Sequence, residues 1–297
     1  MARLFSLPAL VLFLAPSGLA LNNLAGRVAT LTKGFEGTVV LYARNLDTGQ
    51  EFAMDADARV RTASTIKLPI LCALESLVAA GKVEWDERLV VRAEDKVSGS
   101  GVLRSLADGT EVGIRNLAIL MIVVSDNTAT NLILDRIGAD AVNAYLDSIG
   151  LSQTRVNRKV AGGKTAPGWS KAGLVEENKR FGLGVSTPRD MVKLLDLLHQ
   201  GKIVSAQASK DVLQILEQQQ IKTSIGRHAP SEWRVASKSG SLDALRSDVG
   251  IVYTGADSIA MAVTVDEMPR TDYSPDNAGE TLIWQLTETI VDGLSRR

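Results

Sequence analysis

Histidine, cysteine and aromatic residues are scarce in this sequence, and the first two shortages exclude particular kinds of site. The 297-residue chain has two histidines, one cysteine and 4% aromatic residues. His199 ends an apolar run and His228 lies in a loop-like stretch, so we expect no zinc cluster. With no G-x-S-x-G sequence either, a serine–histidine–aspartate hydrolase is not expected. Cys72 cannot form an internal disulfide, and its apolar surroundings predict a buried thiol.

An excess of charge of one sign is also missing. The chain has 33 basic and 34 acidic residues and no long run of either. This balance argues against a nucleic-acid partner and favours a small-molecule or neutral substrate. Gly162-Gly-Lys-Thr165 resembles the end of a phosphate-binding loop, but Arg158 stands where its first glycine belongs. We therefore expect neither a nucleotide nor any other cofactor.

The long apolar stretch of the chain is at its N-terminus. Residues 1–20 combine an early Arg3, an apolar centre broken by two prolines, and small residues at Gly18 and Ala20. This pattern predicts a cleaved secretory signal, a mature chain starting near Leu21, and a secreted or periplasmic protein. An uncleaved anchor is the alternative, but the stretch is short for a stable membrane span.

The remaining residues, about 277, are enough for one large domain or two closely packed lobes. We expect a monomer with one catalytic domain over 21–297. Its α/β (α+β) fold would have a five-stranded antiparallel sheet flanked by helices, in a lobe of about 21–60 and 205–297. A mostly helical lobe of about 61–204 would be inserted, with an irregular stretch at about 156–187 and no strand pattern before the late strands. The expected elements are strands at 37–46, 50–54, 233–239, 249–254 and 259–266, a first helix through Leu24, Val28 and Leu31, and a last helix at 278–294.

Three short motifs carry the chemistry. Ser64-Thr-Ile-Lys67, Ser125-Asp-Asn127 and Lys238-Ser-Gly240 each occur once and in this order. Alone, each has an ordinary explanation, such as a helix start or an N-cap. Together they supply what serine needs to attack a carbonyl without histidine.

A lysine can replace histidine as the base if its pKa is lowered. Lys67 follows Ser64 by one helical turn, which predicts that the amine lies beside the hydroxyl. Burial in a cleft and the positive charge of Lys238 would both lower the pKa of Lys67. The spacing therefore predicts Ser64 as the nucleophile and Lys67 as its base.

The second motif follows an apolar run and precedes a helical one. Ser125 could relay a proton to the leaving nitrogen, and the Asn127 amide could both donate to and accept from a substrate amide. Asp126 is predicted to be a structural cap.

The third motif ends a predicted strand. Lys238 and Ser239 could bind a substrate carboxylate, and Gly240 would let the substrate backbone approach closely. The N–H groups of Ser64 and Ser241 could form an oxyanion hole. Arg246 is a further candidate for the carboxylate, with an ordinary surface strand residue as the alternative.

With these motifs the sequence resembles the penicillin-recognising serine enzymes, most closely class A β-lactamases and their penicillin-binding relatives. The resemblance implies Ser64 as the acylated nucleophile, Lys67 as the base and Ser125 as the proton shuttle. It also implies that Asn127 holds the substrate and that Lys238 and Ser239 bind its carboxylate. The implied substrate is a β-lactam or a D-Ala-D-Ala-type cell-wall peptide.

One segment departs from the class A pattern. Class A enzymes carry R-x-E-x-x-L-N, whose Glu activates the water that releases the acyl-enzyme. Here the matching stretch starts at Arg158, with Val160 at the Glu position and Lys164 at the Asn position. Glu176 or Glu177 could supply the carboxylate from a rearranged loop, or both could be solvated charges.

Three hypotheses follow. The first is a serine hydrolase of the class A β-lactamase type, and it is our main expectation. The second is a D-alanyl-D-alanine carboxypeptidase or esterase that β-lactams acylate and that deacylates slowly. The third is a β-lactam sensor that stays acylated, although no signalling segment accompanies the domain.

Overall fold

The computed structural model describes residues 18–161 and 167–296. Most of the predicted signal sequence lies outside these residues, as does the stretch Gly162-Gly-Lys-Thr165, which includes Lys164. The first helix, α1, spans Gly18–Thr32. Within the described residues, no helix has the length and apolar character needed to cross a membrane. Secretion stays a prediction.

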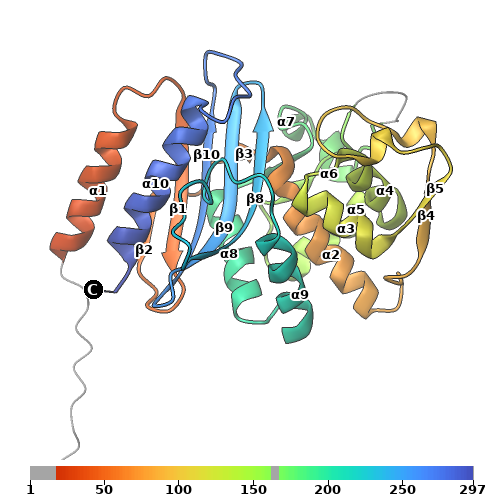
Figure 1. The fold of residues 1–297 in the computed structure, drawn as a ribbon, viewed down its shortest axis with the longest axis horizontal. Helices are drawn as coiled ribbons and strands as arrows, with labels where there is room; N and C mark the ends of the chain where they lie inside the picture. Colours follow the sequence, from red (N-terminus) through yellow and green to blue (C-terminus); the bar gives the residue numbers. More distant parts are fainter. Residues whose placement is uncertain (1–17, 162–166, 297) are drawn as a thin grey trace, which may run out of the picture.

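One antiparallel sheet of five strands organises the fold, as the sequence predicts (Figure 1). Its order is β2-β1-β10-β9-β8, so the two early strands join the three late ones through the β1–β10 pair. In that pair Thr38 lies opposite Asp266. The strands are β1 (Thr38–Asn45), β2 (Glu51–Met54), β8 (Arg234–Leu242), β9 (Leu245–Tyr253) and β10 (Ser258–Asp266).

Both faces of the sheet are buried, and β10 shows how. Its side chains alternate between two cores: Met261 and Val263 face one, while Ala260 and Ala262 face the other. Period-two alternation of this kind is the geometry of a strand covered on both sides. Helices α1 and α10 (Ala278–Leu294) pack together over the first face, at the left of Figure 1.

The other face carries α8 and most of the remaining helices. Helix α8 (Pro188–His199) packs on β1 and β10, and His199 lies in its last turn. The α-helices on this side also include α2 (Lys67–Ala79), α3 (Ile114–Val123), α4 (Asn127–Ile137), α5 (Ala139–Ser148), α6 (Lys171–Leu174), α7 (Glu176–Lys179) and α9 (Ala206–Glu217). Short 3-10 turns are η1 (Ala63–Ile66), η2 (Ala93–Asp95) and η3 (Leu103–Ser105).

The expectation that strands return only late in the chain is wrong. The middle of the chain contains a β4–β5 pair and a small sheet of order β3-β7-β6. These strands have two to four residues, too few to show a period in the sequence. They are β3 (Val60–Arg61), β4 (Arg88–Val91), β5 (Thr110–Gly113), β6 (Arg155–Val156) and β7 (Gly184–Ser186).

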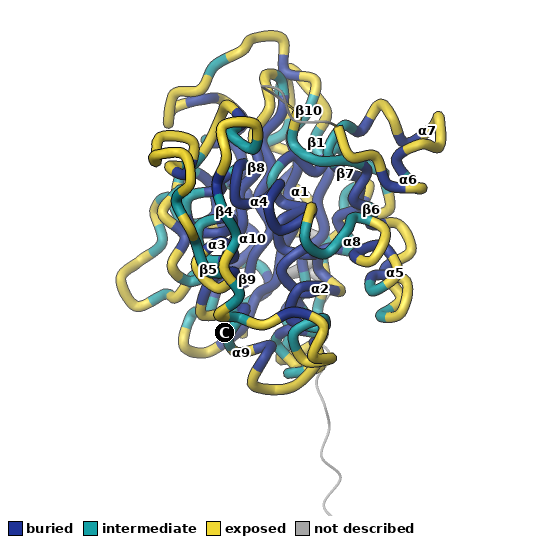
Figure 2. Tube along the Cα trace, turned by 90° about the vertical axis from the view of Figure 1, so that its right-hand side faces the viewer, coloured by how far each residue is buried: buried dark blue, intermediate teal, exposed yellow. Residues whose placement is uncertain are grey.

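Helix α2 lies in the larger core. Residues 67–75 are all buried, and Figure 2 shows the buried chain in dark blue at the centre of the molecule. Cys72 is among them, as predicted, and burial raises the pKa of its thiol. Burial of the first part of this helix also keeps Lys67, its first residue, away from water.

Candidate active site

Ser64 lies in a 3-10 turn that runs directly into α2. The turn is η1, and Lys67 is the first residue of the α-helix. Ser64 is half-buried and lines a pocket of about 760 Å³. Ala63, just before it, has a φ of +45°, a conformation that residues other than glycine seldom adopt. The chain therefore turns sharply to present Ser64 at the pocket.

The Lys67 amine is buried and bonded to the second motif. Its Nζ donates to Ser125 O at 2.7 Å, to Ser125 Oγ at 3.1 Å and to Asn127 Oδ1 at 2.8 Å. Burial holds the pKa of Lys67 well below its ordinary value, and the charge of Lys238 lowers it further, against the opposing effect of Asp126. The lowered pKa favours the neutral amine, which is the form that can accept a proton.

Ser125 occupies the tight connection between α3 and α4. Its φ of +55° is again unusual for a residue with a side chain, and Ser125 is 3% exposed. Asp126 is the N-cap of α4, as predicted, and accepts from Ala129 N at 2.9 Å. It also accepts from Val102 N and Leu103 N, at 2.6 and 2.9 Å. Asp126 thus ties the loop beside the pocket to the start of α4.

The Asn127 side chain is held at both ends. Its Oδ1 accepts from Lys67 and its Nδ2 donates to Ser98 O at 3.0 Å. Asn127 also lines the Ser64 pocket. Its amide therefore has a fixed orientation at the pocket wall.

Lys238 reaches Ser125 from the sheet. It is buried in β8, and its Nζ donates to Ser125 Oγ at 3.1 Å and to Ser239 O at 2.7 Å. Burial lowers the pKa of Lys238 to about 7, although the nearby Asp248 opposes the shift. The three motifs therefore meet at one atom, Ser125 Oγ, which lies between two buried amines.

Gly240 explains how β8 approaches the nucleophile. A Cβ at Gly240 would lie 2.8 Å from Thr62 O and 3.0 Å from Ser64 N. The chain's own backbone fills the space that we expected a substrate to use, so that expectation is corrected. Next to this close approach, Ser239 is buried and Ser241 is exposed and lines the pocket.

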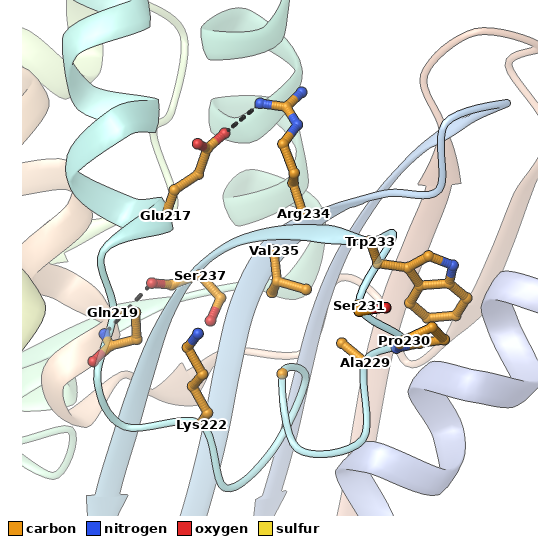
Figure 3. A pocket seen from close by; sticks show the side chains of 11 residues that line it. Glu217, Gln219, Lys222, Ala229, Pro230, Ser231, Trp233, Arg234, Val235 and Ser237 are labelled. Carbon is orange, nitrogen blue, oxygen red and sulfur yellow. Dashed lines mark hydrogen bonds and ion pairs between the residues drawn. The ribbon is translucent and has the colours of Figure 1, made fainter.

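Gln219 connects the two elements that carry Ser125 and Lys238. It is 3% exposed, and its Nε2 donates to Ile122 O at 3.0 Å and to Ser237 O at 3.5 Å. Figure 3 shows it at the edge of a second pocket, on the segment that leads from α9 towards β8. This residue holds the last turn of α3 against β8, a link that the sequence analysis missed because a lone glutamine carries no motif.

Arg246 does not line the Ser64 pocket. It is 1% exposed, and its Nη1 donates to Leu242 O and Leu245 O, both at 2.6 Å. Its Nε lies 3.4 Å from Glu280 Oε1, and its guanidinium is 4.9 Å from the ring centroid of Tyr273. Both sequence interpretations of Arg246 therefore need correction: it is neither free for a substrate nor a surface residue.

The two loop glutamates also lie away from the pocket. Glu176 and Glu177 are exposed in α7, and neither lines the pocket. Glu176 Oε2 lies 2.6 Å from Lys179 Nζ in an ion pair. Their positions argue against the hypothesis that either one activates a water at Ser64.

Val160, at the position of the expected glutamate, does line the pocket. Its backbone N–H donates to Asn131 Oδ1 at 2.8 Å, and its carbonyl accepts from Asn131 Nδ2 at 3.1 Å. The segment is therefore anchored to α4 where the sequence comparison placed it, with an apolar side chain instead of a carboxylate.

Among the described residues, no group of three or more His, Cys, Asp and Glu side chains is placed to hold a metal ion.

Comparison with known proteins agrees with this geometry. The model of the beta-lactamase enzyme family matches residues 23–294. A β-lactamase from Sphaerobacter thermophilus is 33% identical, with 92% of this chain and 97% of that chain covered and a TM-score of 0.79. PBP-A is 28% identical, with 92% and 96% covered and a TM-score of 0.79, and a PBP-A mutant is known as its acyl-enzyme complex with penicillin G. The chain therefore belongs to the beta-lactamase enzyme family and has its serine hydrolase fold.

Proposed function

We propose that the protein is a serine hydrolase of the class A β-lactamase type that opens β-lactam rings through an acyl-enzyme at Ser64. The observation that carries the proposal is the position of Ser125 Oγ, 3.1 Å from the amines of both Lys67 and Lys238. This hydroxyl can exchange protons with either amine beside a pocket that Ser64 lines. The acyl-enzyme complex of the PBP-A mutant is further support.

In the proposed acylation, neutral Lys67 takes the hydroxyl proton of Ser64 as Oγ attacks the lactam carbonyl carbon. The new C–O bond forms and the lactam C–N bond breaks. Ser125 Oγ gives its proton to the leaving nitrogen and regains one from the Lys67 ammonium, so the proton count balances. The N–H groups of Ser64 and Ser241 would stabilise the oxyanion.

Substrate positioning in this proposal uses the pocket walls. Asn127 would hold the substrate amide, since its own amide is fixed by Lys67 and Ser98. Lys238 and Ser239, buried in β8 just before the pocket-lining Ser241, would bind the carboxylate on the leaving-group side.

A second candidate is a D-alanyl-D-alanine carboxypeptidase or esterase that β-lactams acylate and that deacylates slowly. The observation that favours it is the lack of any carboxylate among the described residues that line the pocket. Residues 162–166, which the structure does not describe, include no Asp or Glu in the sequence. Hydrolysis of the acyl-enzyme would then depend on Lys67 alone.

A time course of intact protein mass with excess benzylpenicillin, with product measured in the same samples, tests both candidates. Rapid return to the unmodified mass with accumulating product supports a β-lactamase, and a lasting adduct supports the peptidase. Ser64→Ala should abolish the adduct, whereas Ser100→Ala, at another serine of the pocket lining, should keep it. Ring opening by the Ser64→Ala protein would refute the proposal.

A further inference from the structure

The charged side chains among the described residues that line the Ser64 pocket are all basic. Among the described residues, its lining includes Arg61, Arg158 and Arg180 but no Asp or Glu. Arg61 is neutralised by Asp266, whose Oδ2 accepts from Arg61 Nε at 2.9 Å. Neither of the other two arginines forms an ion pair within the described part of the chain. About two positive charges at the pocket are therefore uncompensated.

Aromatic contacts orient these two guanidinium groups. Arg158 lies 5.6 Å from the ring centroid of Trp169 and donates from Nη1 to Lys159 O at 3.0 Å. Arg180 lies 4.6 Å from the ring centroid of Phe181. A ring contact uses the face of a guanidinium and leaves edge N–H groups able to donate. Both arginines therefore keep donors for an anion.

The two arginines belong to one wall of the pocket. Strands β6 and β7 are paired, with Val156 opposite Gly184, so the chain leaving β6 runs beside the chain entering β7. A Cβ at Gly182 would lie 3.8 Å from Arg158 Nη2, which places the two segments in contact. A different wall comes from Ser241 and Leu242 at the end of β8.

The geometry points to an acyl donor with a second anionic group, and we propose that Arg158 and Arg180 bind it. In a β-lactam or an acylated peptide, the leaving-group carboxylate and the acyl substituent lie on opposite sides of the reactive carbonyl. If β8 binds the carboxylate, the acyl substituent reaches the arginine wall. The preferred substrate class is therefore dianionic, with a carboxylate on the acyl side. This inference rests on the proposed function.

A matched pair of penicillins tests it. Carbenicillin is benzylpenicillin with one added carboxylate, on the side-chain carbon next to the amide carbonyl. The apparent second-order rate constant for acylation of Ser64, measured by intact mass, should be about tenfold higher for carbenicillin. The ratio of the carbenicillin rate constant to the benzylpenicillin rate constant should fall towards one in the protein carrying both Arg158→Gln and Arg180→Gln. High salt should reduce the ratio of the two rate constants in the unaltered protein, because Arg158 is partly exposed and Arg180 is exposed.

Arg115→Gln is the matched control. Arg115 lies 5.8 Å from the ring centroid of Trp85, so the change removes a similar charge and ring contact outside the pocket. It should leave the carbenicillin ratio unchanged. Comparing two substrates within each variant cancels any loss of active protein, and Arg180→Gln alone, at an exposed position, serves if the double variant does not fold.

Each outcome is decisive. Equal acylation by the two penicillins in the unaltered protein, or an unchanged ratio in the arginine variants, overturns this inference and leaves the proposed function standing. If neither penicillin gives an adduct or an opened-ring product, the proposed function is overturned and this inference with it.

Discussion

The two buried amines beside Ser125 should control each other's protonation, and this can be tested with Lys238→Met. Burial is the main cause of the lowered pKa of Lys67, and the charge of Lys238 is the second. Removing that charge makes it easier to protonate Lys67, so the pKa of Lys67 should rise. Because acylation needs a neutral Lys67, the acidic limb of its pH profile should move to higher pH.

The size of the shift follows from the geometry. Each Nζ lies 3.1 Å from Ser125 Oγ, so the two nitrogens are at most about 6 Å apart. With an effective dielectric constant of about 20, two unit charges at about 6 Å interact by about 3 kcal/mol, or about two pKa units. The pKa of Lys238 is itself about 7, so Lys238 loses its proton and its charge as the pH rises above neutral. We expect a shift between about one and two units.

The assay is the rate of Ser64 acylation by benzylpenicillin from pH 5 to 10. Loss of a substrate contact at Lys238 would lower the acylation rate at every pH. The midpoint of the acidic limb reports the pKa of Lys67 independently of that loss. Lys238→Arg keeps the charge and should leave the midpoint near that of the unaltered protein. A midpoint that stays in place, or moves to lower pH, in Lys238→Met would refute the electrostatic argument.

Three other changes test other parts of the site. Asp126→Ala should lower the free energy of unfolding by about 3 kcal/mol in urea, because three backbone N–H groups lose their acceptor, and Asp126→Asn should cost less. Gly240→Ala should slow acylation about tenfold, because its Cβ would displace β8 from Thr62 O; an unchanged rate would contradict this. Val160→Glu should shorten the lifetime of the Ser64 adduct about a hundredfold, measured by intact mass. Asn131 holds the backbone of residue 160 at the pocket, so the new carboxylate could activate a water there. Val160→Gln, which adds no carboxylate, should leave the lifetime unchanged.

Local patterns in the sequence were enough to predict the sheet and the groups around Ser125. Four of the five strands have eight or nine residues, so their apolar periods are readable, and the short β2 was indicated by the turn residues before it. Ser64 and Lys67 are related by a fixed helical spacing. The meeting of Lys67 and Lys238 at Ser125 depends on the fold, but the order of the three motifs in the chain already indicated it.

The arginine wall and the true place of Arg246 could not be predicted in this way. The wall depends on the pairing of the short strands β6 and β7, which carry no period. Arg246 is surrounded by the carbonyls of residues 242 and 245 and by Glu280 of α10. The contact with Glu280 is known only once α10 packs on the sheet. The same limit applies to Glu176, whose spacing in the chain gives no information on its distance from Ser64.

The structure separates the two halves of the proposed reaction. The groups for acylation lie on α2, the α3–α4 connection and β8, which are held by the main core and by links such as that of Gln219. The wall that carries Arg158, Val160 and Arg180 lies on other segments, next to β6 and β7. It is joined to the same core by Val156 and to α4 by the hydrogen bonds between Val160 and Asn131. Substitutions in this wall should therefore change the choice of acyl donor and the lifetime of the acyl-enzyme while leaving the attack by Ser64 intact.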